Sequence, residues 1–289
     1  MPELPEVETV VRGLRETVIG ETIARVRVNA PPTSIVLGLS FKRTRFPSAL
    51  KNRTILRVDR RGKNILIALS GDATLWVHLK MTGHFFYQDK SIPIDKHDLV
   101  IFDFNSNRNG NPNHLRFHDY RRFGRLRLFS NDELWAQPGL ADLGPEPLEI
   151  AADQFVEMCR SRHRMIKPAL LDQRFLAGIG NIYADEALYA SRIHPKQITS
   201  TISRRKLVEL HGHIQRLLKT AIRLMGTSVD TYSGVNGQAG GFQRYLKAYG
   251  REGTPCGVCG RIIVRETIGS RSAHYCPKCQ RLRARITER

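Results

Sequence analysis

The chain has 289 residues, of which 41% are hydrophobic and 25% are charged. These fractions are typical of globular proteins, and no run of about 18 apolar residues is present, which excludes a membrane-spanning helix. Lysine and arginine number 46 against 27 acidic residues, giving a net charge of +19 that favours an anionic partner, nucleic acid first. Membrane-surface binding is the weaker alternative, because no basic amphipathic helix stands out.

The N-terminal segment predicts a helix in a protein that is not secreted. It carries acid where a secretory signal carries base, and no apolar region follows, so we expect a cytoplasmic protein. Pro5 suits the first turn of a helix over residues 5–18. The apolar residues of this segment recur at helical spacing and form one stripe: Val7, Val10, Val11, Leu14 and Val18.

A series of β-rich segments follows this helix. Runs rich in β-branched and aromatic residues are separated by turn formers, which predicts six strands or more in a β-sandwich. The predicted strands cover residues 22–28, 54–58, 64–69, 74–86, 99–104 and 115–129. We place them, with the helix, in an N-terminal domain over 1–136. An Asn-rich loop at 105–113 has no readable role.

The second half of the chain predicts helices. Residues 137–147 hold three prolines and two glycines without periodicity, so we place a linker at 137–152. Short helices at 168–172 and 182–190 flank a tight turn at 178–181, and this helix-turn-helix pattern is typical of DNA-binding units. A longer amphipathic helix covers 207–225. We assign 153–250 to this helical region and its glycine-rich segment, 226–241, to a long loop.

Four of the five cysteines form two Cys-x-x-Cys pairs near the C-terminus. Sixteen residues separate the pairs, which indicates one tetrahedral structural Zn²⁺ with no position open for a catalytic water. Disulfides are the alternative, and the spacing and the expected compartment disfavour them. The ligands are Cys256, Cys259, Cys276 and Cys279. The domain over 251–289 holds nine basic and three acidic residues, which favours a phosphate contact.

Basic and aromatic residues alternate between Arg116 and Arg127. One interpretation is an exposed strand face. The other is a DNA-reading segment in which arginine contacts bases or phosphates and an apolar wedge unstacks the duplex. Met81 alone reads as a core residue, and Cys159 as a small buried hydrophobe.

The first residues of the chain carry candidate chemistry. Removal of Met1 would leave Pro2 with a secondary α-amine beside the Glu3 carboxylate. An α-amine has a pKa of about 8, so about a tenth to a fifth is unprotonated at neutral pH. Such an amine can attack a sugar C1′ and form a cationic iminium that acidifies the C2′ proton. The alternative is that Pro2 only stiffens the start of the chain.

Together these features resemble the bacterial formamidopyrimidine-DNA glycosylase family. The resemblance spans nearly the whole chain, and its motifs occur in the expected order. They are MPELPEVE at 1–8, RGK at 61–63, HLKMTG at 78–83, KHD at 96–98, RRFG at 121–124, LLDQ at 170–173, GNIYADEAL at 180–188 and YGREG at 249–253.

The resemblance implies an α+β fold: an N-terminal two-sheet β-sandwich with a leading helix, and a C-terminal helix-two-turn-helix domain with a β-hairpin zinc finger. It also implies catalytic roles for four residues. Pro2 is the implied nucleophile and Glu3 the acid/base, while Lys63 contacts the flanking phosphate. Arg271 has a catalytic role and, with Asn181, clamps phosphates around a flipped nucleotide. Glu6 matches a second, supporting acidic position.

Further DNA contacts are carried over in the same way. Met81, Arg121 and Phe123 match the residues that fill the void left by the flipped lesion, and His97 and Lys167 match positions near phosphate or lesion. Three departures bear on this region: Tyr120 replaces a usual proline, Lys80 replaces a frequent glycine, and the Asn-rich loop looks inserted. The 226–241 loop keeps only part of the usual lesion-binding pattern.

The implied function is a bifunctional DNA glycosylase and AP lyase of base excision repair. It would excise oxidised purines, namely formamidopyrimidines and 8-oxoguanine opposite cytosine. It would then cut the strand by β,δ-elimination. The expected partner is damaged double-stranded DNA, bound by a monomer at the bacterial nucleoid with one structural zinc and no membrane. Two alternatives stay open: an abasic-site lyase without base excision, and a non-catalytic damaged-DNA binder.

Overall fold

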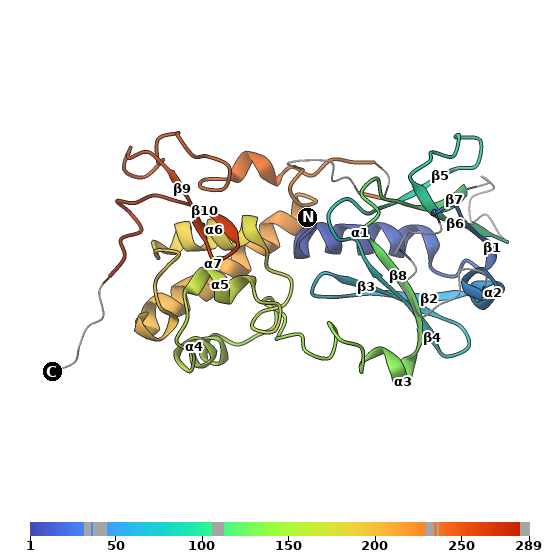
Figure 1. Cartoon of the computed structure of the whole chain (residues 1–289), viewed down its shortest axis with the longest axis horizontal. Coiled ribbons are helices and arrows are strands. Elements are labelled where there is room, and N and C mark those ends of the chain that lie inside the picture. Colours follow the sequence, from blue (N-terminus) through green and yellow to red (C-terminus); the bar gives the residue numbers. More distant parts are fainter. Residues whose placement is uncertain (32–35, 37–44, 106–112, 229–233, 236, 284–289) are drawn as a thin grey trace. The chain divides into compact units, whose positions relative to one another are not determined.

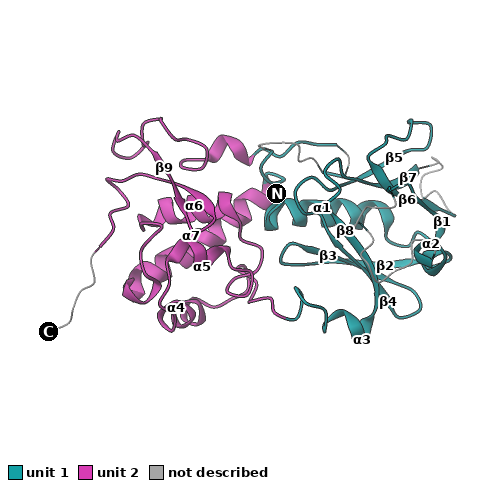
Figure 2. Ribbon diagram, in the orientation of Figure 1, with its two compact units in different colours: residues 1–141, 224–241 teal, residues 142–223, 242–289 magenta. Residues whose placement is uncertain are grey.

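The computed structural model describes residues 1–31, 36, 45–105, 113–228, 234–235 and 237–283. The chain forms two compact units (Figure 2): unit 1 holds Met1–Ala141 and Leu224–Gly241, and unit 2 holds Asp142–Arg223 and Phe242–Arg289. The segment 224–241, which we predicted within the helical region, thus groups with the N-terminal unit. Most of the Asn-rich loop and residues 229–233 and 236 of the lesion loop lie outside the described residues.

Unit 1 contains two four-stranded antiparallel sheets and a leading helix (Figure 1). The first sheet has the strand order β1 (Ile23–Val28), β6 (Asp98–Phe104), β7 (Asn113–His118) and β5 (His84–Asp89). The second has the order β2 (Ile55–Arg61), β3 (Asn64–Leu69), β4 (Ala73–His78) and β8 (Arg125–Ser130). Two short helices, α2 (Arg45–Leu50) and α3 (Asn131–Leu134), complete the unit. The predicted α+β sandwich is confirmed.

The leading helix α1 (Leu4–Val18) buries its predicted apolar stripe. It packs against β2 and β3, and its valines and leucine belong to one hydrophobic core with residues of both sheets. At its start a proline occupies the first turn, where a missing N–H costs no helical hydrogen bond. The core therefore holds the beginning of the chain in a defined place.

Two long predicted strands, 74–86 and 115–129, are each split into two strands that belong to different sheets. The chain turns at Lys80 and Arg122, whose φ angles of 56° and 58° lie in the left-handed region. At Gly83 and Gly124 a Cβ atom would lie 2.9 and 2.5 Å from the Phe117 ring. These loops therefore pack tightly on the sheet, and they carry the side chains discussed below.

Unit 2 is built from helices and a β-hairpin. Its helices are α4 (Ala152–Arg160), α5 (Ile166–Leu171), α6 (Asn181–Ser191) and α7 (Arg204–Arg223), with short 3₁₀ turns η1 (Thr199–Thr201) and η2 (Phe242–Tyr245). The hairpin pairs β9 (Val264–Ile268) with β10 (Arg271–Tyr275). Helix α6 packs against α7 and β10. Among the described residues, no helix is both long and apolar enough to cross a membrane.

Candidate nucleic-acid interface and zinc site

The N-terminal residues are held by the carboxylate of Glu6. Pro2, Glu3 and Glu6 are buried, and Glu6 accepts hydrogen bonds from the backbone N–H groups of Glu3 (2.9 Å) and Thr227 (2.7 Å). Gly226 has a φ of 81°, and a Cβ atom there would lie 2.8 Å from Glu6 Oε1. The start of the chain and the start of the 226–241 segment are thus fixed to one side chain.

Lys63 lies in the tight turn between β2 and β3. Gly62 takes a φ of 57° in this turn, and the Lys63 side chain is 6% exposed. Arg60 donates to Glu8 Oε2 (3.1 Å) and to the Gly62 carbonyl (3.1 Å). Glu8 of α1 is therefore connected through Arg60 to the turn that carries Lys63.

A group of cations surrounds His78 at the same end of this sheet. Strand pairing places His78 opposite Arg125, and the pair two residues further along joins Trp76 and Arg127, so these side chains share one face of the sheet. Burial, followed by the charges of Lys80, Lys63 and Arg125, lowers the pKa of His78 to about 3. His78 is therefore neutral at physiological pH, and its Nδ1 accepts the Lys80 N–H (3.0 Å).

This group is suited to a phosphate. Arg127 Nε is buried and has no hydrogen-bond partner among the residues that the structure describes. Like charges that repel one another are stabilised by a bound anion. The sequence did not indicate that His78 and Lys80 belong to this group of cations, although it showed the alternation of arginines at 125 and 127. What was missing is the register that brings two distant segments together.

The predicted wedge residues lie on the two tight loops. Met81 is 40% exposed and Phe123 is 45% exposed, which is high for large apolar side chains in a folded protein. The Arg121 guanidinium lies 5.0 Å from the centre of the Phe123 ring, a cation–π distance. The structure thus brings Met81, Arg121 and Phe123 onto neighbouring loops, in agreement with a surface that contacts a partner.

Asp119 joins these two loops. It is fully buried and accepts hydrogen bonds from the Thr82 hydroxyl (2.5 Å), the Arg121 N–H (3.2 Å) and the Gly124 N–H (2.7 Å). A buried carboxylate with this many donors rigidifies the backbone around it. Asp119 was missed because a single Asp in a strand-rich segment carries no local signal.

Arg116 and His97 lie in the same region, and the structure bears differently on what the sequence indicated for each of them. Arg116 is 1% exposed and pairs with Asp98 (3.0 Å), so neither interpretation of the segment from Arg116 to Arg127, an exposed strand face or a DNA-reading segment, holds for this residue. His97 lies before β6, with its ring partly exposed and its Nδ1 2.9 Å from Asp95 Oδ1. A DNA contact for His97 stays a prediction.

In unit 2, Asn181 and Arg271 belong to adjacent elements. Asn181 is the first residue of α6, and its Nδ2 donates to the hydroxyl of Ser272 (3.3 Å), the residue after Arg271 in β10. Arg271 is exposed. Asn181 Oδ1 is buried without a hydrogen-bond partner in the described part of the chain. The N-terminus of a helix with a nearby arginine favours phosphate binding.

Lys167 corrects the sequence prediction. Its side chain has no exposed surface, and its Nζ pairs with Asp185 Oδ1 (2.5 Å) and donates to the Ser272 carbonyl. The other oxygen of Asp185 accepts from the N–H and Nδ1 of His274 (3.0 Å each). The predicted DNA contact of Lys167 is therefore contradicted: this lysine fastens β10 to α5 and α6.

We expect Lys167→Met to act on stability. Removal of Lys167 leaves Asp185 Oδ1 buried without its cation, and removing one partner of a buried ion pair costs about 3–5 kcal/mol. Thermal unfolding of the full chain measures this loss. The matched control is Lys196→Met, because Lys196 and Glu266 form an exposed pair worth about 0–1 kcal/mol. An unchanged unfolding temperature in Lys167→Met would contradict a structural role.

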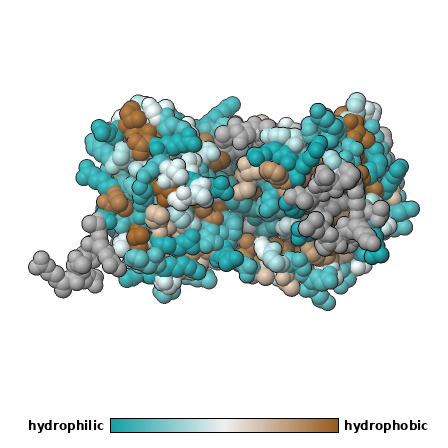
Figure 3. Space-filling view, in the orientation of Figure 1, coloured by the Kyte–Doolittle hydropathy of each residue, from teal (hydrophilic) through white to brown (hydrophobic). Residues whose placement is uncertain are grey.

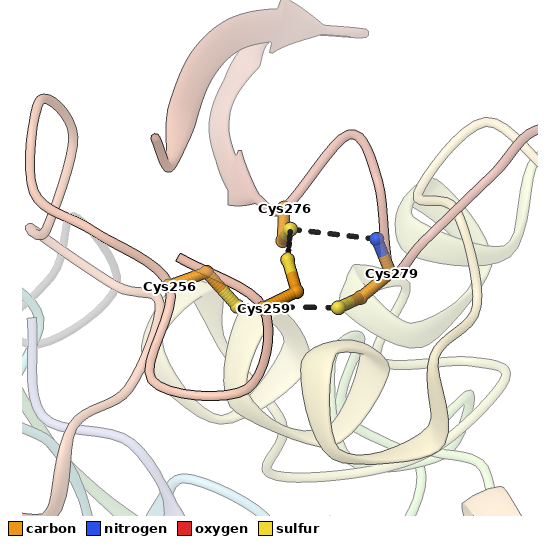
Figure 4. Close-up of side chains that lie close together, drawn as sticks. All are labelled: Cys256, Cys259, Cys276 and Cys279. Atoms are coloured by element: carbon orange, nitrogen blue, oxygen red, sulfur yellow. Dashed lines mark hydrogen bonds between the residues drawn. The ribbon is translucent and has the colours of Figure 1, made fainter. Parts of the chain in front are cut away.

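The four cysteines converge on one point in unit 2 (Figure 4). Cys256 Sγ lies 4.0 Å from Cys279 Sγ, and Cys259 Sγ lies 3.5 Å from Cys276 Sγ. Tetrahedral Zn²⁺ with Zn–S distances of about 2.3 Å requires sulfur separations of about 3.8 Å. Tyr189 supports the site, since its hydroxyl lies 3.1 Å from Cys256 Sγ. The cysteines fit one structural zinc ion, as predicted.

Hydrophilic residues predominate on the face drawn in Figure 3, and hydrophobic residues form only small patches there.

Three family models match this chain. They are the formamidopyrimidine-DNA glycosylase N-terminal domain over residues 1–126, the formamidopyrimidine-DNA glycosylase H2TH domain over 143–233, and a zinc finger found in FPG and IleRS over 253–282.

Curated relatives and solved structures are similar over almost the full length. The formamidopyrimidine-DNA glycosylase of Pelotomaculum thermopropionicum is 43% identical, covering 98% of this chain and 100% of the relative. That of Moorella thermoacetica is 44% identical, covering 92% and 94%. A mutant Lactococcus lactis FPG in complex with Fapy-dG-containing DNA has a TM-score of 0.87 at 34% identity, covering 97% and 100%. The Lactococcus lactis Fpg complex with abasic-site DNA gives 0.86 at 34%, covering 96% and 99%.

Proposed function

The chain belongs to the formamidopyrimidine-DNA glycosylase family, and from this premise we propose that its buried N-terminal proline performs the chemistry. The protein is a DNA glycosylase of base excision repair that acts on oxidised purine lesions in DNA. The observation that carries the proposal is the Glu6 carboxylate, which fixes the Glu3 N–H beside Pro2 in a buried setting.

In the proposed reaction, Pro2 acts after Met1 has been removed. The nitrogen lone pair of Pro2 attacks C1′ of the damaged nucleotide, and the bond from C1′ to the base breaks. The base leaves with the electron pair of that bond and takes up the proton that the Pro2 nitrogen loses. The Glu3 carboxyl group supplies a proton to the sugar-ring oxygen, the ring opens, and a cationic iminium forms between Pro2 and C1′. The iminium draws electrons from C2′, which then loses a proton, and the 3′-phosphate leaves by β-elimination; δ-elimination releases the 5′-phosphate.

The cations of unit 1 are proposed to hold the phosphate next to the lesion. Lys63 lies beside the network that joins α1 to the β2–β3 turn, and Lys80 and Arg125 lie around neutral His78. A fixed positive charge stabilises the anion that develops as the phosphate leaves. Arg271 and Asn181 are proposed to clamp the phosphates of the flipped nucleotide from unit 2.

Met81, Arg121 and Phe123 are proposed to replace the flipped base in the stack. Their exposure, and the tight backbone held by Asp119, support a rigid apolar wedge with a guanidinium that can hydrogen-bond the orphaned cytosine. The bacterial relatives support action in the cytoplasm at the nucleoid.

We expect Arg271→Ala to weaken binding to damaged duplex DNA and to make this binding less sensitive to salt concentration. One lost phosphate contact lowers the slope of log K against log salt by about 0.9. Binding titrations at several salt concentrations measure the slope. Arg205→Ala is the matched control, because Arg205 is an exposed arginine of unit 2 with no proposed DNA contact. An unchanged slope in Arg271→Ala would refute its place in the clamp.

Borohydride trapping on damaged DNA tests the proposed function as a whole. Borohydride reduces the iminium between Pro2 and C1′ to a stable amine and so yields a covalent complex attached at Pro2, whereas a protein that only binds DNA is trapped, if at all, through a lysine on an abasic aldehyde.

A further inference from the structure

A second cluster of metal-ligating side chains lies in unit 1, at the end of the sheet where β5, β6 and β7 meet. It consists of Asp95, His97 and His118, and one potential ligand atom from each residue lies within 4.8 Å of the others. Together with the four cysteines, it is one of two such groups in the described chain. The proposed reaction uses neither Asp95 nor His118.

The backbone places these residues with little freedom. Asp95 Oδ1 accepts the backbone N–H of His97 (2.8 Å), and the Asp95 N–H donates to Asp98 Oδ2 (2.9 Å). Strand pairing then sets Asp98 opposite His118 across β6 and β7. Hydrogen bonds and strand register, rather than chance contact of long side chains, bring the two imidazoles and the carboxylate together.

His118 has the outer-sphere partner that metal-bound histidines have. Its Nδ1 lies 2.9 Å from Asp98 Oδ1, and Asp98 is 2% exposed with its other oxygen 3.0 Å from Arg116 Nη1. A carboxylate paired with arginine only accepts hydrogen bonds, so His118 Nδ1 donates and Nε2 keeps its lone pair. This carboxylate–histidine arrangement fixes the tautomer and increases the basicity of the ligand nitrogen.

Ring contacts limit rotation of the His118 side chain. The His84 ring stacks on it at 6.1 Å, and Phe86 meets its edge at 5.6 Å. The ring of His97 lies 5.7 Å away at 70°. Solvent still reaches the cluster, because the side chains of His97, His118 and Asp95 are 26%, 21% and 55% exposed. An ion can therefore enter without unfolding, and it meets ligands that need little rearrangement.

We propose that Asp95, His97 and His118 form an exchangeable binding site for a divalent transition-metal ion. Two imidazoles and one carboxylate suit Zn²⁺, Co²⁺ or Ni²⁺ and leave coordination positions open to water. An ion bound here engages His97, so the occupied site withdraws that side chain from DNA. This second statement depends on the DNA contact proposed for His97, whereas metal binding itself does not.

Calorimetric titration of Co²⁺ into the zinc-loaded full chain tests the site. Co²⁺ is chosen because it binds more weakly than Zn²⁺ and leaves the cysteine site intact, which a zinc assay verifies. We expect one additional ion per chain, bound at least about tenfold more weakly by His118→Ala and by Asp95→Asn. The Asp95 side chain is exposed, and an asparagine there keeps an Oδ1 acceptor for the His97 N–H, so the Asp95→Asn chain should fold as the parent does.

His163→Ala is the matched control, because His163 is an exposed histidine in unit 2 that contacts Ser200. It should bind Co²⁺ as the parent chain does. Absence of the additional ion, or equal affinity in the parent, His118→Ala and Asp95→Asn chains, would overturn the site.

Titration of the same proteins with abasic duplex DNA, with and without Co²⁺, tests the consequence. Saturating Co²⁺ should weaken DNA binding by the parent chain several-fold and leave His118→Ala unaffected. Equal weakening of both would refute the competition while the calorimetric result stands. Failure of the zinc-loaded chain to bind damaged DNA in the absence of Co²⁺ would instead contradict the proposed DNA interface.

Discussion

Replacing Pro2 with glycine should abolish the normal covalent trapping of DNA and lower strand cleavage by at least about 10³-fold, as expected when a nucleophile is removed. The secondary amine of proline forms an iminium that cannot lose its charge by deprotonation at nitrogen. The primary amine of glycine forms a protonated imine, which can lose its N–H proton and become neutral. Binding should stay nearly intact, because the phosphate contacts lie elsewhere. Single-turnover cleavage and borohydride trapping measure the two losses.

Pro5→Ala supplies the matched control for this change. Pro5 is also a proline of the N-terminal segment and lies in the first turn of α1, but it has no free amine. It should keep cleavage and trapping near the parent level. Pro2→Gly that traps DNA with parental kinetics would remove Pro2 from the mechanism.

Replacing Cys276 with serine should release the zinc ion and weaken DNA binding by at least about tenfold, since a hydrogen bond to a charged group contributes about 1.5–3 kcal/mol. Cys276 directly follows β10, whose first residue is the proposed phosphate ligand Arg271. The core of unit 1 contains no cysteine ligand, so unit 1 should keep its fold. Zinc content, DNA titration and unfolding curves measure the three quantities.

Cys159→Ala controls for the loss of a cysteine as such. Cys159 is fully buried in α4 of the same unit, and burial raises the pKa of its thiol to about 12. The variant should retain its zinc. Undiminished DNA affinity in zinc-free Cys276→Ser would contradict a role of the zinc finger in binding.

Periodicity and spacing were sufficient to predict the leading helix and the zinc ligands, whereas the two-sheet arrangement and the helix-two-turn-helix domain came from the family resemblance. The valine stripe of α1 repeats at 3.6-residue spacing and is buried as a unit, and the Cys-x-x-Cys pairs specify their ion by local spacing alone. The two long strand segments were misjudged because their β-rich composition continues through the turns. The turns depend on left-handed residues at Lys80 and Arg122 and on glycines that fit against Phe117, which is a tertiary contact.

Residues of the candidate site could be predicted from the sequence only where they belong to a local motif. Lys167 and Arg116 are cations that read as surface residues, yet each is buried against an aspartate far along the chain. Burial of a charge is decided by a distant partner, which one sequence does not reveal. Asp119 was invisible for the same reason, because its donors come from two separate loops.

Borohydride trapping followed by mass spectrometry of the attached peptide tests the central claim most directly. The Met1-processed chain is incubated with duplexes that carry 8-oxoguanine opposite cytosine or an abasic site. We expect covalent complexes with both duplexes, attached at Pro2. Trapping on the abasic duplex alone would indicate a lyase without excision of this base, and trapping on neither, or attachment at a lysine, would contradict the proposed mechanism.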